Sequence, residues 1–158
     1  MILSSVQVIG DSTMKSKIYE FDPVIYPFSI HVTKDFDKDE LKSIYKALDS
    51  EEKEVPIDLD VPSTTIARTI QVVDADNGNL FYLVCLFHPE EEAGAGVASH
   101  EADHIATAYL QDLGVPSPTP WNDEPHAYFV QWVTNCIWSV IIDETDKMKG
   151  KLYEVEKS

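Results

Sequence analysis

The chain has 158 residues, of which 44% are hydrophobic, 10% aromatic and 25% charged. This composition is that of one packed domain, and it excludes a collagen-like or wholly disordered chain. Twelve Lys and Arg against 28 Asp and Glu give a formal net charge of −16, which argues against nucleic-acid phosphates and acidic membrane surfaces as partners. Because we find neither a membrane-length apolar run nor the pattern of a secretory signal, we expect a cytoplasmic protein.

β-branched and aromatic residues predict strands through the first half of the chain. The expected strands lie within residues 16–21, 24–33, 64–73 and 80–88. The pair Asn77-Gly78, between the last two runs, is the strongest hairpin signal in the sequence. We therefore expect a small, mainly antiparallel sheet.

Three segments have the spacing of helices. Residues 35–48 place apolar side chains at intervals of three and four, as an amphipathic helix does. A second helix is expected from about residue 97 to 113, where Gly114 stops it. A third is expected to begin after Asn122 or Asp123 and to run to about residue 142.

These elements predict a single α+β domain over residues 1–142, followed by a charged tail over residues 143–158. We expect the tail to be a frayed extension of the last helix or disordered. Cys85 and Cys136 lie in apolar runs, so we expect both to be core residues with free thiols.

The segment His100-Glu101-Ala102-Asp103-His104 is an HExxH sequence inside the second expected helix. Residues one helical turn apart lie on one side, so His100 and His104 can both bind one Zn²⁺. Glu101 is then placed to act as general base on a metal-bound water, whose pKa zinc lowers toward about 7.

Catalytic zinc takes three protein ligands, and Glu124 is available at the start of the third helix. An acid there is also typical of a well-capped helix, so capping alone remains an alternative. Asp123 is the alternative ligand.

His100-Glu101-x-x-His104 followed by Glu124 resembles the zincin metallopeptidases with a glutamate ligand, the thermolysin-like gluzincins. The resemblance implies a third ligand on the second helix, and an edge strand beside the metal helix that receives extended substrate. It also implies a minimal zincin-like fold, in which the sheet packs against the HExxH helix and a second ligand-bearing helix.

The stretch Glu124-Pro125-His126-Ala127-Tyr128 adds a similarity to short phage- and prophage-type proteins described as peptidases. In the thermolysin-like pattern an acid stands where this chain has Tyr128, so the groups around the ligands differ from that pattern. We expect Tyr128 or Tyr109 to steady the tetrahedral intermediate, with His126 and His88 as further candidates.

The sequence therefore predicts a zinc metallopeptidase acting on a peptide or protein substrate, with a negative field that would favour basic peptides. Three alternatives stay open: an accidental motif on a solvated helix face, a structural or vestigial zinc site without turnover, and an acidic interaction or decoy protein. The decoy would need no metal.

Overall fold

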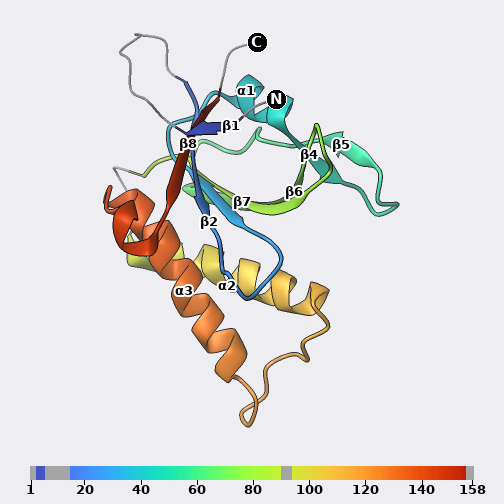
Figure 1. The fold of residues 1–158 in the computed structure, drawn as a ribbon, viewed down its shortest axis with the longest axis vertical. Coiled ribbons are helices and arrows are strands. Elements are labelled where there is room, and N and C mark those ends of the chain that lie inside the picture. Colours follow the sequence, from blue (N-terminus) through green and yellow to red (C-terminus); the bar gives the residue numbers. More distant parts are fainter. Residues whose placement is uncertain (1–2, 6–14, 90–93, 156–158) are drawn as a thin grey trace.

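A computed structural model describes the backbone of residues 3–5 and the whole of residues 15–89 and 94–155. Figure 1 shows strands and helices in separate layers. The helices are α1 (Lys38–Ile44), α2 (Ala95–Asp112), α3 (Glu124–Ile141) and the short 3-10 helix η1 (Thr145–Met148). The strands are β1 (Leu3–Ser5), β2 (Lys17–Phe21), β3 (Ile30–Thr33), β4 (Tyr45–Leu48), β5 (Glu54–Pro56), β6 (Ala67–Asp74), β7 (Leu80–Leu86) and β8 (Lys151–Val155).

The described strands form one eight-stranded sheet in the order β1-β8-β2-β3-β7-β6-β4-β5. Only β3 and β7 pair in parallel, and each other neighbouring pair is antiparallel. The prediction of an α+β fold with a mainly antiparallel sheet is thus confirmed.

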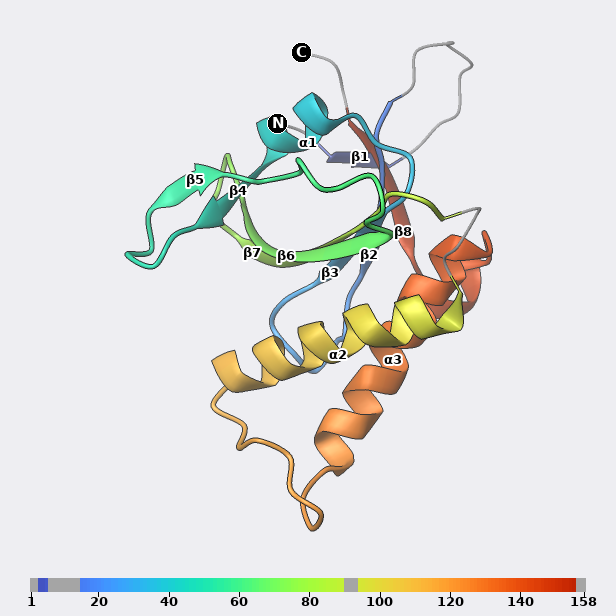
Figure 2. The ribbon, with the colours of Figure 1, turned by 180° about the vertical axis from the view of Figure 1, so that it is seen from behind.

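The sheet separates two apolar layers. Helices α2 and α3 cover one face, and α1 lies on the other (Figures 1 and 2). The side chains of β7 alternate between the layers: Tyr82 and Val84 pack on the α2 and α3 side, whereas Leu83 and Cys85 pack on the α1 side. Because both faces are covered, this central strand is an almost continuous apolar run.

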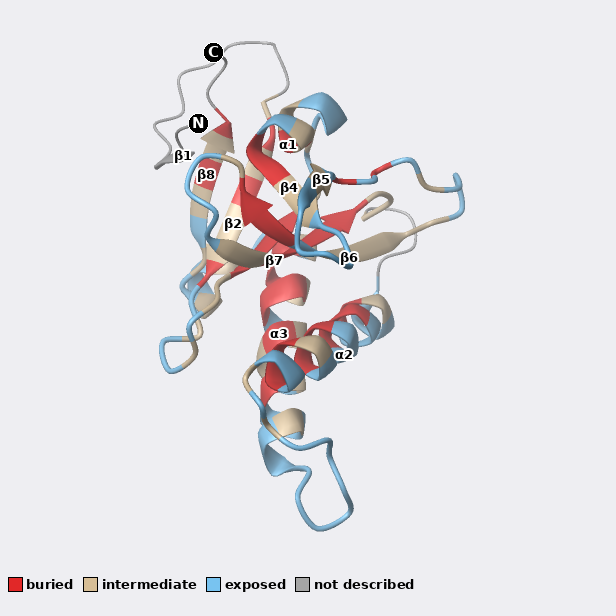
Figure 3. Cartoon of the chain, turned by 90° about the vertical axis from the view of Figure 1, so that its right-hand side faces the viewer, coloured by how far each residue is buried: buried red, intermediate tan, exposed pale blue. Residues whose placement is uncertain are grey.

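Helices α2 and α3 agree with the sequence prediction to within two residues at each end. Gly114 follows α2 with a φ of 73°, the left-handed conformation that stops a helix. Buried residues occupy the sides of α2 and α3 that face each other and the sheet, and exposed residues the outer sides (Figure 3). No helix within the described ranges combines the length and apolar character needed to cross a bilayer.

The hairpin predicted at Asn77-Gly78 joins β6 to β7. Gly78 has a φ of 73°, and its N–H donates to the Asp74 carbonyl at 2.8 Å. The Asp74 carboxylate accepts hydrogen bonds from the turn backbone as well. The turn therefore holds β6 and β7 in one register.

The helix predicted over residues 35–48 is wrong in its second half, since α1 ends at Ile44 and Tyr45 begins strand β4. Tyr45 pairs with Asp74 of β6, and its side chain is buried beside His31. Sheet pairing with a distant strand thus overrides the local helical spacing. Of the run 24–33, only Ile30–Thr33 is a strand.

The tail predicted over residues 143–158 is also wrong where it is described. Residues 151–155 form β8, which lies between β1 and β2 inside the sheet. Tyr153 and Val155 are both buried. They lie two residues apart on the strand, so both side chains face the same side of the sheet. The folded domain therefore extends to at least residue 155.

Cys85 and Cys136 are buried free cysteines, as predicted. Burial raises the pKa of the Cys85 thiol to about 12. Both residues act as small apolar core residues.

A buried hydrogen-bonded group joins β2, β3 and β4. His31, which is fully buried, contacts the Tyr45 hydroxyl through Nδ1 and Glu20 Oε2 through Nε2, the latter at 3.0 Å. The His31 ring also stacks on Phe81, with centroids 4.2 Å apart. The hydrogen bond from His31 lowers the pKa of Glu20, which means that the folded state favours the charged carboxylate.

We expect Glu20→Gln to lower the free energy of unfolding by about 1–2 kcal/mol at pH 7. Because the pKa of Glu20 is lower in the folded than in the unfolded chain, this stabilisation is present above the unfolded pKa. It is lost as the pH falls through the folded value. Urea unfolding between pH 7 and pH 3, with exposed Glu54→Gln as control, measures this. If Glu20→Gln lowered the free energy of unfolding by the same amount at every pH, the stabilisation would not come from the charged Glu20 carboxylate.

Candidate metal centre

Helix α2 is oriented by one apolar face. Ala98, Ala102, Ile105 and Tyr109 are buried in the core between the sheet and α3, at the spacing of a single helical stripe. His100 and His104 lie outside this stripe and are exposed. The packing therefore fixes which way the histidines point.

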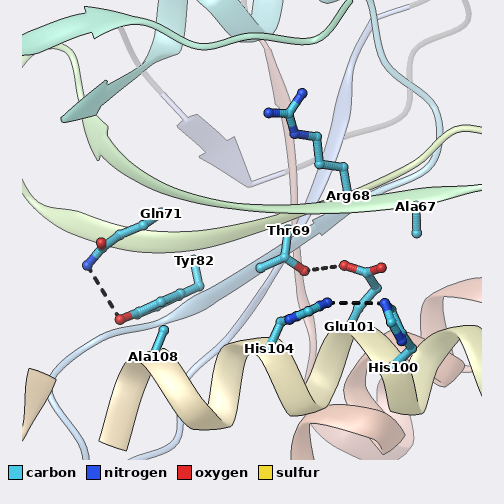
Figure 4. A pocket seen from close by; sticks show the side chains of 9 residues that line it. All are labelled: Ala67, Arg68, Thr69, Gln71, Tyr82, His100, Glu101, His104 and Ala108. Atoms are coloured by element: carbon cyan, nitrogen blue, oxygen red, sulfur yellow. Dashed lines mark hydrogen bonds between the residues drawn. The ribbon is translucent and has the colours of Figure 1, made fainter. Parts of the chain in front are cut away.

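The two histidine rings point toward one another on the side of α2 that faces β6, and their Nε2 atoms are within hydrogen-bond distance (Figure 4). Their Nε2 atoms lie 3.1 Å apart. Two nitrogens bound to one tetrahedral zinc at about 2.0–2.1 Å would lie about 3.3 Å apart. The pair is thus close to the spacing that a shared zinc ion requires, without any change of backbone.

Glu101 lies beside the pair and is held by the sheet. Its side chain is 6% exposed, and Oε2 accepts a hydrogen bond of 2.6 Å from the Thr69 hydroxyl on β6. This bond directs the carboxylate into the space between helix and sheet (Figure 4). A carboxylate in this position can take a proton from a water next to the histidines.

A cleft of about 430 Å³ separates β6 from α2. The histidines and Glu101 line one end, and Gln71, Tyr82 and Ala108 line the other (Figure 4). The cleft is large enough for several side chains of an extended peptide.

The rim of the cleft includes an unpaired stretch of strand. Backbone hydrogen bonds join Ile66 and Asp74 to the β7 side of β6, and alternate residues of an antiparallel strand face the same neighbour. On the opposite side β4 pairs with only the last two residues of β6. Among the described residues, no strand pairs there with the backbone of Ala67, Thr69 and Gln71.

Glu124, the predicted third ligand, is exposed at the start of α3 and does not line the cleft. Asp123, the alternative ligand, occupies the cap position before it without a side-chain capping bond. Within residues 15–89 and 94–155, no three His, Cys, Asp or Glu side chains form a group that could hold a metal. The third ligand therefore stays a prediction.

The two tyrosines predicted to steady the intermediate lie away from the cleft. Tyr109 is fully buried, and its hydroxyl donates to the Phe28 carbonyl at 2.9 Å and accepts from the Phe28 N–H at 2.7 Å. Tyr128 is 67% exposed and borders a different hollow, beside Tyr26 and Trp132. Neither tyrosine lines the cleft, so their part in catalysis stays a prediction.

The other two candidate histidines have protein partners. His126 Nε2 lies 3.5 Å from an Asp103 carboxylate oxygen and 3.4 Å from the Thr107 hydroxyl, at the junction of α2 and α3. His88 Nε2 lies 2.8 Å from the Ser63 carbonyl oxygen. Neither side chain lines the cleft.

Sequence reasoning missed the sheet side of the site. Thr69 and Gln71 are polar residues at alternate positions of a β-prone run, a pattern that places both on one face of a strand. That signal was available, but only the fold shows that this face meets α2.

No protein-family model, curated protein or solved structure matched the chain. The function is therefore inferred from the residues of the cleft.

We expect Tyr109→Phe to lower the free energy of unfolding by about 1–3 kcal/mol, because it removes both hydrogen bonds to the Phe28 backbone. Tyr128→Phe removes the same atom from an exposed side chain and should change the stability by less than about 0.5 kcal/mol. Chemical denaturation compares the two. Equal stabilities would show that the Tyr109 hydroxyl has no structural role.

Proposed function

We propose that the protein is a zinc-dependent peptide hydrolase whose reaction takes place in the cleft between β6 and α2. The observation that carries this proposal is the convergence of His100 and His104, with Nε2 atoms 3.1 Å apart, next to a carboxylate held by Thr69. The resemblance to zincin metallopeptidases supports the same chemistry.

In this proposal each residue has one role. His100 and His104 hold the zinc ion, which would lower the pKa of a bound water and polarise the substrate carbonyl. Glu101 takes the proton of the attacking water and returns it to the leaving amine. The Thr69 hydroxyl positions Glu101 for both transfers through its 2.6 Å hydrogen bond.

The unpaired edge of β6 suggests how substrate binds. An extended peptide laid along Ala67, Thr69 and Gln71 would form backbone hydrogen bonds with that edge, as an added strand does. Its backbone would then cross above the two histidines. This favours a peptide or protein substrate over a small molecule.

Glu124 remains our proposed third ligand, because catalytic zinc takes three protein ligands. The support for it is the spacing shared with the gluzincins. Glu124 lies at the exposed start of α3, outside the cleft, so it is tested separately from the histidine pair.

The proposal is tested with zinc-loaded protein and a mixture of peptides, with new amino termini identified by mass spectrometry. Glu101→Gln should keep the metal and lower the rate of hydrolysis by about 10²–10⁴-fold, because it removes the general base. His104→Ala should lose both the metal and the activity. Glu54→Gln, an exposed change on β5, is the matched control.

Hydrolysis by Glu101→Gln at the wild-type rate would exclude Glu101 as general base. No hydrolysis of any peptide by the metal-loaded wild type would overturn the proposal itself.

A further inference from the structure

A carboxylate lies beside the cleft, next to two residues that line its end away from the histidines. Asp112, the last residue of α2, accepts hydrogen bonds on Oδ2 from the Tyr82 hydroxyl at 2.7 Å and from Gln71 Nε2 at 2.9 Å. Tyr82 and Gln71 both line the cleft. The sheet thus orients the exposed Asp112 side chain beside the end of the cleft.

The partners of Asp112 are neutral, so its charge is oriented but not compensated. Burial raises the pKa of Tyr82, which keeps its hydroxyl protonated and donating at neutral pH. Among the described residues, no ion pair involves Asp112. A carboxylate of this kind can still bind a cation.

Among the described residues that line the cleft, Arg68 is the one cation. From Thr69 to Asp146 the sequence contains no Lys or Arg, so α2, α3 and their connection carry none. Arg68 points away from α2 (Figure 4), and its guanidinium lies 3.5 Å from Asp58. The potential at the Asp112 end of the cleft is therefore negative.

We propose that Asp112, with Tyr82 and Gln71, forms a subsite for a Lys or Arg side chain of the substrate. This inference rests on the proposed function and specifies its substrate class: peptides with a basic residue at a fixed distance from the cleaved bond. An ammonium or guanidinium group would pair with the carboxylate that the two neutral donors hold in place.

The dimensions of the cleft set that distance. Asp112 lies eight residues after His104 on α2, a rise of about 12 Å. An extended peptide advances about 3.3 Å per residue, and its side chains stand nearly perpendicular to the backbone but can lean along it. The basic residue should therefore lie two to four positions from the cleaved bond.

The test uses peptides cleaved at one known bond, with Lys or neutral Gln at each of the four positions on either side. At low salt, the wild type should cleave the Lys peptide with a kcat/KM about two- to fivefold above that of the Gln peptide, at one position only. In Asp112→Asn the ratio should fall to about one. This variant keeps an oxygen that accepts from Tyr82 and Gln71.

Glu54→Gln removes one negative charge far from the cleft and should keep the wild-type ratio. A wild-type ratio near one would overturn the inference, and so would a preference that survives in Asp112→Asn. The first result would leave the proposed hydrolysis intact, since both peptides would still be cleaved.

Binding separates the two proposals further. The binding of the same peptides to zinc-loaded Glu101→Gln, followed by fluorescence anisotropy, needs no turnover. If the wild type cleaves nothing while the Lys peptide still binds more tightly than the Gln peptide, the proposed function fails and the subsite stands. Equal binding of the two peptides contradicts the subsite.

Discussion

The rotation of α2 about its own axis is the constraint on which the site depends. A helix presents each side chain in a direction set by its buried stripe, and here that stripe includes Ala102 and Ile105. Tyr109 lies in the same stripe, and its hydroxyl makes two hydrogen bonds with the Phe28 backbone that restrain the helix near its C-terminal end. With that rotation fixed, His100 and His104 can point only toward β6.

The sheet then supplies what a helix alone lacks. Thr69 holds Glu101 in the cleft, and Tyr82 with Gln71 holds Asp112 beside it, so both acids are oriented by residues of β6 or β7. The hairpin at Gly78 keeps these two strands in one register. The positions of the acids beside the two histidines of α2 thus depend on the pairing of β6 with β7.

Local patterns predicted the local features. The helical spacing of α2 and α3, the stop at Gly114 and the turn at Asn77-Gly78 all follow from neighbouring residues. The sequence predicts a helix at Tyr45 and a tail at β8, and both predictions are wrong. Strands β4 and β8 are defined by pairing with strands far along the chain, which local patterns do not show. For the same reason the sequence indicates the His100 and His104 pair but not Asp112, whose role depends on the helix and sheet lying side by side.

The central claim is that the two histidines hold a metal. Elemental analysis of protein purified without chelator or affinity-tag metal tests it most directly, on the wild type, His104→Ala and Glu124→Ala together. We expect about one zinc per wild-type chain and almost none in His104→Ala, because catalytic zinc needs its full ligand set. A lower content in Glu124→Ala would identify the third ligand. A wild type that holds no zinc and takes up none on titration would show that the two histidines are not a metal site.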